Sequence, residues 1–189
     1  AGSLVAPDRL RFDFSHGEAV SDDQLAAIEV SINQAIGAHY PVKINFMDQK
    51  EAISQGAMAL FGEKYGDIVR TISIGEEPGP DAYSFELCGG LHVEETNDIG
   101  LFKIVGESAV AAGVRRVEAV TGRAAQELVA GRLQLLDNLL VLLNVPEDEA
   151  GHRLETLLAE NRTQQKQIAT LQQKLARDQF GDLLDQVQQ

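Results

Sequence analysis

Hydrophobic residues follow two different periods along the chain, and the change between them falls near residue 122. Before that point, short stretches alternate apolar and polar residues, as in 10–14, which is typical of a half-buried strand. Other stretches favour strands because they are rich in β-branched and apolar residues. These further predicted strands are 41–47, 67–74, 83–87, 101–105 and 114–120.

Two segments of the first part have helical spacing instead. Ser21, followed by two acidic residues, is a typical helix start, and apolar residues recur every three or four positions until Gly37. A second, short helix is predicted over 48–56. Two glycines and two prolines predict a loop over 75–81. Helices and strands mixed without a βαβ rhythm predict an α+β domain with a largely antiparallel sheet and packed helices.

From residue 123 onward the apolar residues keep only helical spacing. A leucine-rich face predicts one helix over 122–144 and a second over 146–180. The second helix carries about three heptads, with Asn161 and Gln164 at seam positions. A short connection between two amphipathic helices predicts an antiparallel hairpin or coiled coil, which could also support self-association. A long solvated surface helix is the alternative.

Charge and length exclude some classes of protein. No apolar run approaches the ~18 residues of a membrane span and no leader opens the chain, so we expect a cytoplasmic protein without a membrane partner. A net charge of −13 argues against a broad nucleic-acid surface, and RNA binding would need a local site. Arg115 and Arg116 are candidates for such a site, because neighbours on a strand point to opposite faces. A salt bridge to Glu118 is the alternative.

The candidate chemistry lies in one short loop. Cys88, the only cysteine, and His92 are four positions apart, separated by Gly89 and Gly90, at the end of a predicted strand. Zinc favours Cys and His ligands, and the glycines allow a tight turn. Spacing alone gives half a zinc site, and a small buried cysteine is the alternative. The other histidines are expected to make local or solvent contacts: His16, His39 and His152.

Five collinear blocks of the first 122 residues resemble the editing domain of bacterial-type alanyl-tRNA synthetases. They are 1–5 with 10–16, 56–65, 86–92, 98–104 and 112–122. The helical remainder resembles the coiled coil that follows this domain. The resemblance implies the fold of the second additional domain shared by threonyl- and alanyl-tRNA synthetases. It divides the chain into an editing domain at 1–122 and, at 123–189, a helical linker toward a C-terminal domain.

The resemblance also implies a ligand set. The family holds one zinc ion with a His-x-x-x-His pair and a Cys-x-x-x-His pair, and Cys88 and His92 match the second pair. The first pair is expected upstream of this chain, so the chain alone should hold zinc weakly and lack activity. Leu91 departs from the family, which usually has Thr at this position. Loss of the threonine hydroxyl beside a ligand would alter hydrogen bonding around the ligands or contact with the substrate.

The implied reaction is hydrolysis of the ester that joins serine or glycine to alanine tRNA. A binding site sized for alanine distinguishes it from serine or glycine by only ~1–3 kcal/mol of binding free energy, so a second, hydrolytic site is needed. Zinc can position the substrate, polarise its carbonyl or activate water. The parent enzyme is a ligase whose ATP and Mg²⁺ belong to a separate aminoacylation domain. The alternatives are a free-standing trans-editing hydrolase and a non-catalytic coiled-coil module.

Overall fold

The computed structural model describes residues 2–59, 66–75, 79 and 81–187, with side chains as far as residue 177. Its elements in chain order are β1 (Gly2–Ala6), β2 (Arg9–Ser15), α1 (Asp22–Gly37), β3 (Val42–Asp48), α2 (Gln49–Ser54), β4 (Ile68–Ile74), β5 (Ser84–Leu87), η1 (Thr96–Ile99), β6 (Phe102–Ala111), β7 (Val114–Thr121), α3 (Gly122–Leu143), η2 (Glu147–Glu149) and α4 (Ala150–Val187). They form two compact units, 1–130 and 131–189, which are described separately. The predicted α+β class is confirmed.

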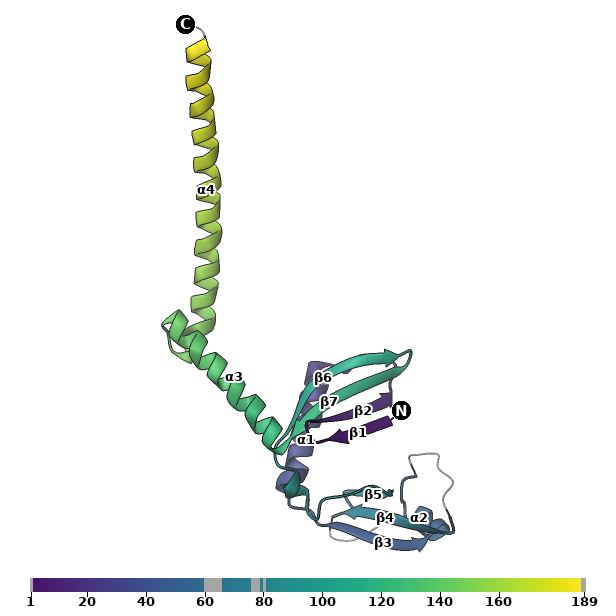
Figure 1. Ribbon diagram of the computed structural model, residues 1–189. Helices are drawn as coiled ribbons and strands as arrows, with labels where there is room; N and C mark the ends of the chain where they lie inside the picture. Colours follow the sequence, from purple (N-terminus) through teal and green to yellow (C-terminus); the bar gives the residue numbers. More distant parts are fainter. Residues whose placement is uncertain (1, 60–65, 76–78, 80, 188–189) are drawn as a thin grey trace. The chain divides into compact units, whose positions relative to one another are not determined.

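The described residues of the first unit form two antiparallel sheets, whereas the sequence predicts one (Figure 1). The larger sheet has the strand order β1-β2-β7-β6 and the smaller one β3-β4-β5. Largely antiparallel pairing is therefore confirmed, but the single sheet is wrong. Hydrophobic alternation identifies a strand without naming its partner, so it could not show that the strands divide into two sheets. The strand β1 was not predicted, and β6 runs six residues beyond the predicted end at 105.

Helix α1 covers one face of the four-stranded sheet. It begins at the expected place, because the Ser21 hydroxyl accepts a hydrogen bond from the Gln24 N–H and the Gln24 side-chain oxygen accepts one from the Ser21 N–H. Its apolar face contributes Ile36, which packs in a buried cluster with Phe102 of β6 and Ala119 of β7. The amphipathic spacing seen in the sequence is thus explained by burial against this sheet.

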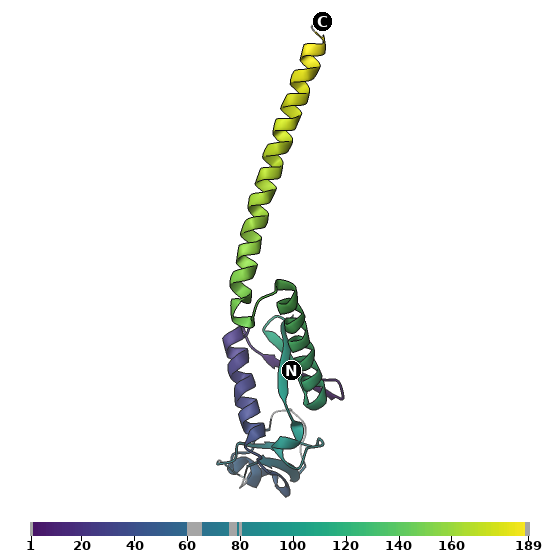
Figure 2. The same ribbon diagram turned by 90° about the vertical axis from the view of Figure 1, so that its left-hand side faces the viewer.

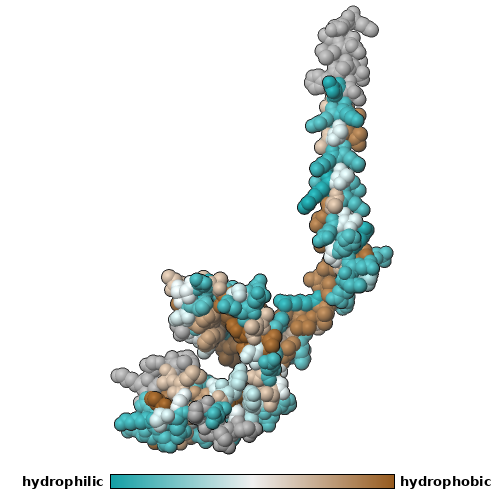
Figure 3. All heavy atoms as spheres, turned by 180° about the vertical axis from the view of Figure 1, so that it is seen from behind, coloured by the Kyte–Doolittle hydropathy of each residue, from teal (hydrophilic) through white to brown (hydrophobic). Residues whose placement is uncertain are grey.

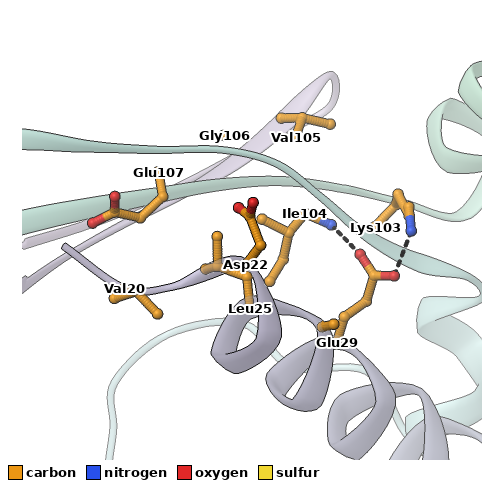
Figure 4. A pocket seen from close by; sticks show the side chains of 10 residues that line it. Val20, Asp22, Leu25, Glu29, Lys103, Ile104, Val105, Gly106 and Glu107 are labelled. Atoms are coloured by element: carbon orange, nitrogen blue, oxygen red, sulfur yellow. Dashed lines mark hydrogen bonds and ion pairs between the residues drawn. The ribbon is translucent and has the colours of Figure 1, made fainter.

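Polar side chains of α1 also bind the edge of β6. Asn33 accepts from the Phe102 backbone N–H at 3.0 Å and donates to the Phe102 carbonyl at 2.9 Å. Glu29 accepts from the Ile104 N–H at 2.9 Å and from Lys103 Nζ at 2.5 Å (Figure 4). These contacts satisfy backbone groups that an edge strand otherwise leaves open.

The smaller sheet packs one face against α2. Asp48 caps that helix by accepting from the N–H groups of Lys50 and Glu51, as its position in the sequence suggested. Phe85, Leu87 and Val69 are buried on this face beside Ala52 and Ala57. The predicted loop over 75–81 lies partly outside the described residues, as do 60–65 of one resembling block.

Thr96 of η1 connects the end of α1 to the segment after β5. Its hydroxyl donates to the Ala35 carbonyl at 2.8 Å and accepts from the Tyr40 N–H at 2.9 Å, and the residue is buried. Pro41 and Glu95 form an isolated antiparallel bridge beside it. The chain that leaves the Cys88 loop is therefore anchored a few residues later.

The two predicted helices are confirmed as α3 and α4, and α4 runs without interruption to Val187 (Figure 2). The predicted antiparallel hairpin is not confirmed. The two helices are bent by 72° at the break between them, whereas a hairpin needs the second helix to return along the first. Asn144 ends α3 with φ = 54°, and the short 3-10 turn η2 starts the new direction.

Apolar side chains consequently remain at the surface of the helices. They gather along α3, while α4 is largely hydrophilic (Figure 3). Leu135, Leu139 and Leu142 of α3 are all exposed. Among the described residues, no single helix is long and apolar enough to cross a membrane; α3 and Glu147–Arg177 pass that test only together, as a bent pair judged by length and composition.

Candidate functional site

Cys88 and His92 lie together just beyond the end of β5, which is an edge strand of the smaller sheet. Cys88 Sγ is 3.3 Å from His92 Nε2. The Cys88 N–H donates to the Arg70 carbonyl at 3.3 Å, which continues the β4–β5 pairing by one residue. The predicted closeness of the two side chains at the sheet edge is confirmed. Their role as metal ligands stays a prediction.

The two glycines shape the turn around the sulfur. The Gly90 N–H donates to Cys88 Sγ at 3.4 Å. A Cβ built on Gly90 would lie 3.5 Å from Cys88 Sγ and 3.9 Å from His92 Nε2. A side chain there would fill the space beside both polar atoms. The turn therefore places a sulfur and a nitrogen at one point and keeps that point clear.

The geometry and chemistry of the pair suit zinc. With Zn–S near 2.3 Å and Zn–N near 2.0–2.1 Å, tetrahedral coordination places the two ligand atoms ~3.5 Å apart, close to the distance found. Burial and, next, the nearby Arg70 guanidinium lower the pKa of His92, while Glu86 opposes them. The imidazole is therefore more completely neutral at neutral pH, and neutral imidazole is the form that binds metals.

Cys88 and His92 alone do not make a complete metal site. Within the described residues, no group of three or more His, Cys, Asp or Glu side chains could hold a metal ion. The other histidines stand elsewhere: His16 against Phe14 of the larger sheet, His39 at the end of α1, and His152 in α4. Cys88 and His92 fit two positions of a zinc site, which would need further ligands beyond those described.

The two arginines singled out in the sequence are bound within the larger sheet. Arg115 pairs with Glu107 of β6, and Arg116 pairs with Asp13 of β2, each through two guanidinium nitrogens. Side-chain exposure is only 16% for Arg115 and 26% for Arg116. The salt-bridge alternative was correct in kind, but Glu118 was the wrong partner. RNA contact by either arginine stays a prediction.

Each arginine lowers the pKa of its carboxylate partner. The hydrogen bond from Arg116 is the largest cause for Asp13, and the one from Arg115 is the largest cause for Glu107. Both carboxylates therefore remain ionised to a lower pH than usual. These pairs join neighbouring strands across the sheet, a stabilising role.

A pocket of about 400 Å³ lies away from the cysteine, between the first turns of α1 and β6 (Figure 4). No motif or spacing in the sequence indicates this pocket. Glu29 points to the Lys103 ammonium and the Ile104 N–H, and Glu107 is bound by Arg115. Glu29 therefore joins the helix to the sheet, whereas Glu107 joins β6 to β7.

The sequence also missed Arg70, which lies on β4. Its Nη1 donates to the Cys88 carbonyl at 2.6 Å and to the Gly90 carbonyl at 2.8 Å. A single arginine inside a strand rich in β-branched residues has no spacing signal. Its partners are backbone atoms, which leave no mark in the sequence.

The elements that carry this loop define a class of domain. Residues 69–118 match the protein family described as the threonyl and alanyl tRNA synthetase second additional domain. The match begins in β4, includes the Cys88 loop and ends in β7. The antiparallel α+β fold agrees with it.

The whole chain is similar to alanine–tRNA ligases. It is 48% identical over 188 residues to that of Granulibacter bethesdensis, covering 98% of this chain and 21% of the relative. It is 52% identical over 184 residues to that of Halorhodospira halophila, covering 97% of this chain and 21% of the relative. It is 48% identical over 189 residues to that of Exiguobacterium sibiricum, covering 100% of this chain and 21% of the relative. The chain belongs to the alanyl-tRNA synthetase family and spans about a fifth of the length of these relatives.

Proposed function

We propose that Cys88 and His92 are two zinc ligands of an editing site, which hydrolyses the ester between alanine tRNA and a wrongly attached serine or glycine. The observation that carries this proposal is the 3.3 Å approach of Sγ and Nε2 around a point that Gly90 leaves clear. Similarity to alanine–tRNA ligases over the whole chain supports the choice of tRNA as partner.

Each residue of this site would have its own role. Cys88 supplies a thiolate and His92 supplies Nε2, while the Gly90 N–H holds the sulfur in place. A bound zinc ion supplies Lewis acidity toward a carbonyl, or a bound water of lowered pKa. Two further histidine ligands come from a His-x-x-x-His pair outside this chain, so the chain alone holds zinc weakly.

The smaller sheet offers a place beside this loop for additional structure. Ile44, Phe46 and Ile68 of β3 and β4 are exposed on one face, and Arg70 lies directly across from Phe46. That face is the one not packed against α2. An apolar face next to an incomplete ligand set is consistent with a site completed by residues beyond those described.

The parent enzyme would be a cytoplasmic ligase that attaches alanine to its tRNA, with ATP and Mg²⁺ used in a separate domain. A free-standing trans-editing hydrolase is the alternative, and similarity to alanine–tRNA ligases over 98% of this chain, helical segment included, favours the large ligase. The exposed leucines of α3 favour self-association as an additional property.

Hydrolysis of serine-charged alanine tRNA tests the editing function. Residues 1–189 should be inactive, and a chain extended through the histidine pair should be active. In the extended chain, Cys88→Ala and His92→Gln should each abolish zinc binding and activity, because each removes a ligand. His152→Gln, an exposed histidine of α4, is the matched control and should retain both.

Two results would count against this function. Hydrolysis that persists after removal of zinc with a chelator would show that zinc is not required. Retention of zinc and activity by Cys88→Ala would exclude Cys88 from the site. Metal content measured by atomic emission alongside the deacylation rate separates these two cases.

A further inference from the structure

Arg70 contacts the Cys88 loop at three points. Its Nη1 donates to the carbonyl oxygens of Cys88 and Gly90, at 2.6 Å and 2.8 Å. Its own carbonyl accepts from the Cys88 N–H at 3.3 Å. The loop is thus held at Cys88 by backbone and side chain together, and at Gly90 by the side chain. The two carbonyls bracket the turn from which the sulfur projects.

We propose that Arg70 is the positioning residue of the metal site, fixing the turn so that Cys88 and His92 face the same point. The inference rests on the zinc site proposed above. It adds a residue that does not touch the metal and acts through the loop. The geometry points to this role because the guanidinium binds the backbone on both sides of Gly89, next to the ligands themselves.

The turn needs such a restraint because of its sequence. Gly89 and Gly90 have the largest backbone freedom of any residues, so an unrestrained turn loses much conformational entropy when two ligands must converge. A charged donor makes stronger hydrogen bonds than a neutral one. Arg70 therefore lets the loop be ordered before metal arrives, and less of the binding free energy is used in ordering it.

The shape of the guanidinium matters beyond its charge. The two N–H groups of Nη1 diverge within a rigid plane and so can reach two carbonyls at once. A lysine keeps the positive charge on a flexible stem with a different reach. The Arg70→Lys variant should therefore keep only part of the function that the Arg70→Met variant loses. Full restoration by lysine would show that charge alone accounts for the effect.

Cobalt binding to residues 1–189 provides the direct test. Co²⁺ replaces zinc and gives a thiolate charge-transfer band, which reports on Cys88 alone because the chain has one cysteine. Residues that orient metal ligands typically contribute about 10–100-fold to metal affinity. Arg70→Met should weaken cobalt binding by about 10-fold or more and reduce the band at equal metal concentration. Arg70→Lys should lie between Arg70→Met and the unsubstituted chain.

A matched control separates this role from general stabilisation. Lys103 is also a partly buried cation on a sheet, bound to Glu29, and it lies in the other sheet. Lys103→Met should leave cobalt affinity and the thiolate band unchanged. Thermal unfolding followed by circular dichroism checks that both methionine variants are folded at the temperature of the titration.

A measurement without metal tests the same mechanism. In the presence of chelator, the amide hydrogen of Gly90 should exchange faster in Arg70→Met, because the turn that holds the Gly90 N–H against Cys88 Sγ is released. Amides of α1 should exchange at the same rates in both proteins. This readout is independent of whether zinc is the natural metal.

The outcomes distinguish the two proposals. If neither residues 1–189 nor the chain extended through the histidine pair shows a cobalt–thiolate band that depends on Cys88, the zinc site is wrong and Arg70 has no metal-positioning role. If only the extended chain shows it, the same comparison of Arg70 variants is made in that chain. If the unsubstituted chain shows the band and Arg70→Met has the same affinity, band and Gly90 exchange, the zinc site stands and the inference about Arg70 is overturned. If Arg70→Met is unfolded, Arg70→Lys decides by the same comparison.

Discussion

The two sheets of the first unit use arginine in different ways. In the four-stranded sheet, Arg115 and Arg116 bind carboxylates on neighbouring strands. In the three-stranded sheet, Arg70 binds the carbonyl oxygens of a loop. Exposed apolar residues do not separate the two regions, since Phe12 of the larger sheet is half-exposed like Ile44 of the smaller one. The two regions differ instead in the groups that accept hydrogen bonds from these arginines.

The two kinds of acceptor have different physical consequences. A carboxylate partner neutralises an arginine and ties two strands together, so the contact is complete within the fold. Carbonyl oxygens carry no full negative charge, so Arg70 can bind the loop and still, second to burial, lower the pKa of the neighbouring His92. The first arrangement stabilises a sheet; the second, in our proposal, positions two metal ligands.

The largest expected effect concerns the two faces of the smaller sheet. Phe85 is 4% exposed in the cluster under α2, whereas Phe46 is 71% exposed on the opposite face. Phe85→Ala should lower the free energy of unfolding by about 3–5 kcal/mol. Phe46→Ala should change it by less than about 0.5 kcal/mol. Urea unfolding followed by circular dichroism measures both. Equal losses would show that the Phe46 face is also covered in solution.

A smaller effect should appear in the pH dependence of stability. The pKa values of Asp13 and Glu107 are lowered in the folded protein, chiefly by hydrogen bonds from Arg116 and Arg115. Their contribution to stability is therefore fully present above the unfolded pKa values near 4 and is lost as pH falls through the lower folded values. The urea midpoint of the unsubstituted chain should drop in this range.

Substitution of the two carboxylates tests this assignment. The double variant Asp13→Asn, Glu107→Gln should be less stable at neutral pH and should lose less stability on acidification, because neutral amides do not titrate. Urea midpoints measured from pH 7 down to pH 3 give the comparison. An identical pH dependence in both proteins would mean that these pairs do not dominate the acid response.

Local structure was largely predictable because its signals are local. The start of α1 at Ser21 and its end at Gly37, the cap at Asp48 and the end of β5 before Cys88 follow from residue types and spacing. The Cys88–His92 pair was found in the same way. A four-residue spacing across two glycines predicts a tight turn, and the turn brings the side chains together.

Features that depend on partners distant in sequence were not predictable. The pairing of Arg116 with Asp13 requires the β2–β7 register, which no single strand encodes. β1 was missed because 2–6 lacks the alternation that marked the other strands. The helical hairpin was not confirmed, since two apolar stripes show that each helix needs a partner without showing that the partner is the other helix. Arg70 was missed because its contacts are with the backbone.

The smallest expected effect belongs to Leu91, which lies between the two proposed ligands. Its side chain is fully exposed, with a relative exposure of 102%, so it packs against nothing in the described part of the chain. Leu91→Thr should therefore change the free energy of unfolding by less than about 0.5 kcal/mol. Cobalt affinity should also be unchanged, because the Gly90 N–H, the Cys88 carbonyl and Arg70 hold the turn without using the side chain of Leu91.

A hydroxyl at this position could then act only on a bound substrate. In a chain extended through the histidine pair, Leu91→Thr should alter the ratio of serine to glycine hydrolysis while leaving metal content unchanged. That separation is expected because a threonine hydroxyl can hydrogen-bond a serine side chain, and glycine offers no such group. Deacylation rates for the two charged tRNAs, measured beside zinc content, supply the comparison. A loss of zinc in Leu91→Thr would instead show that residue 91 helps to shape the ligand turn, contrary to its exposure.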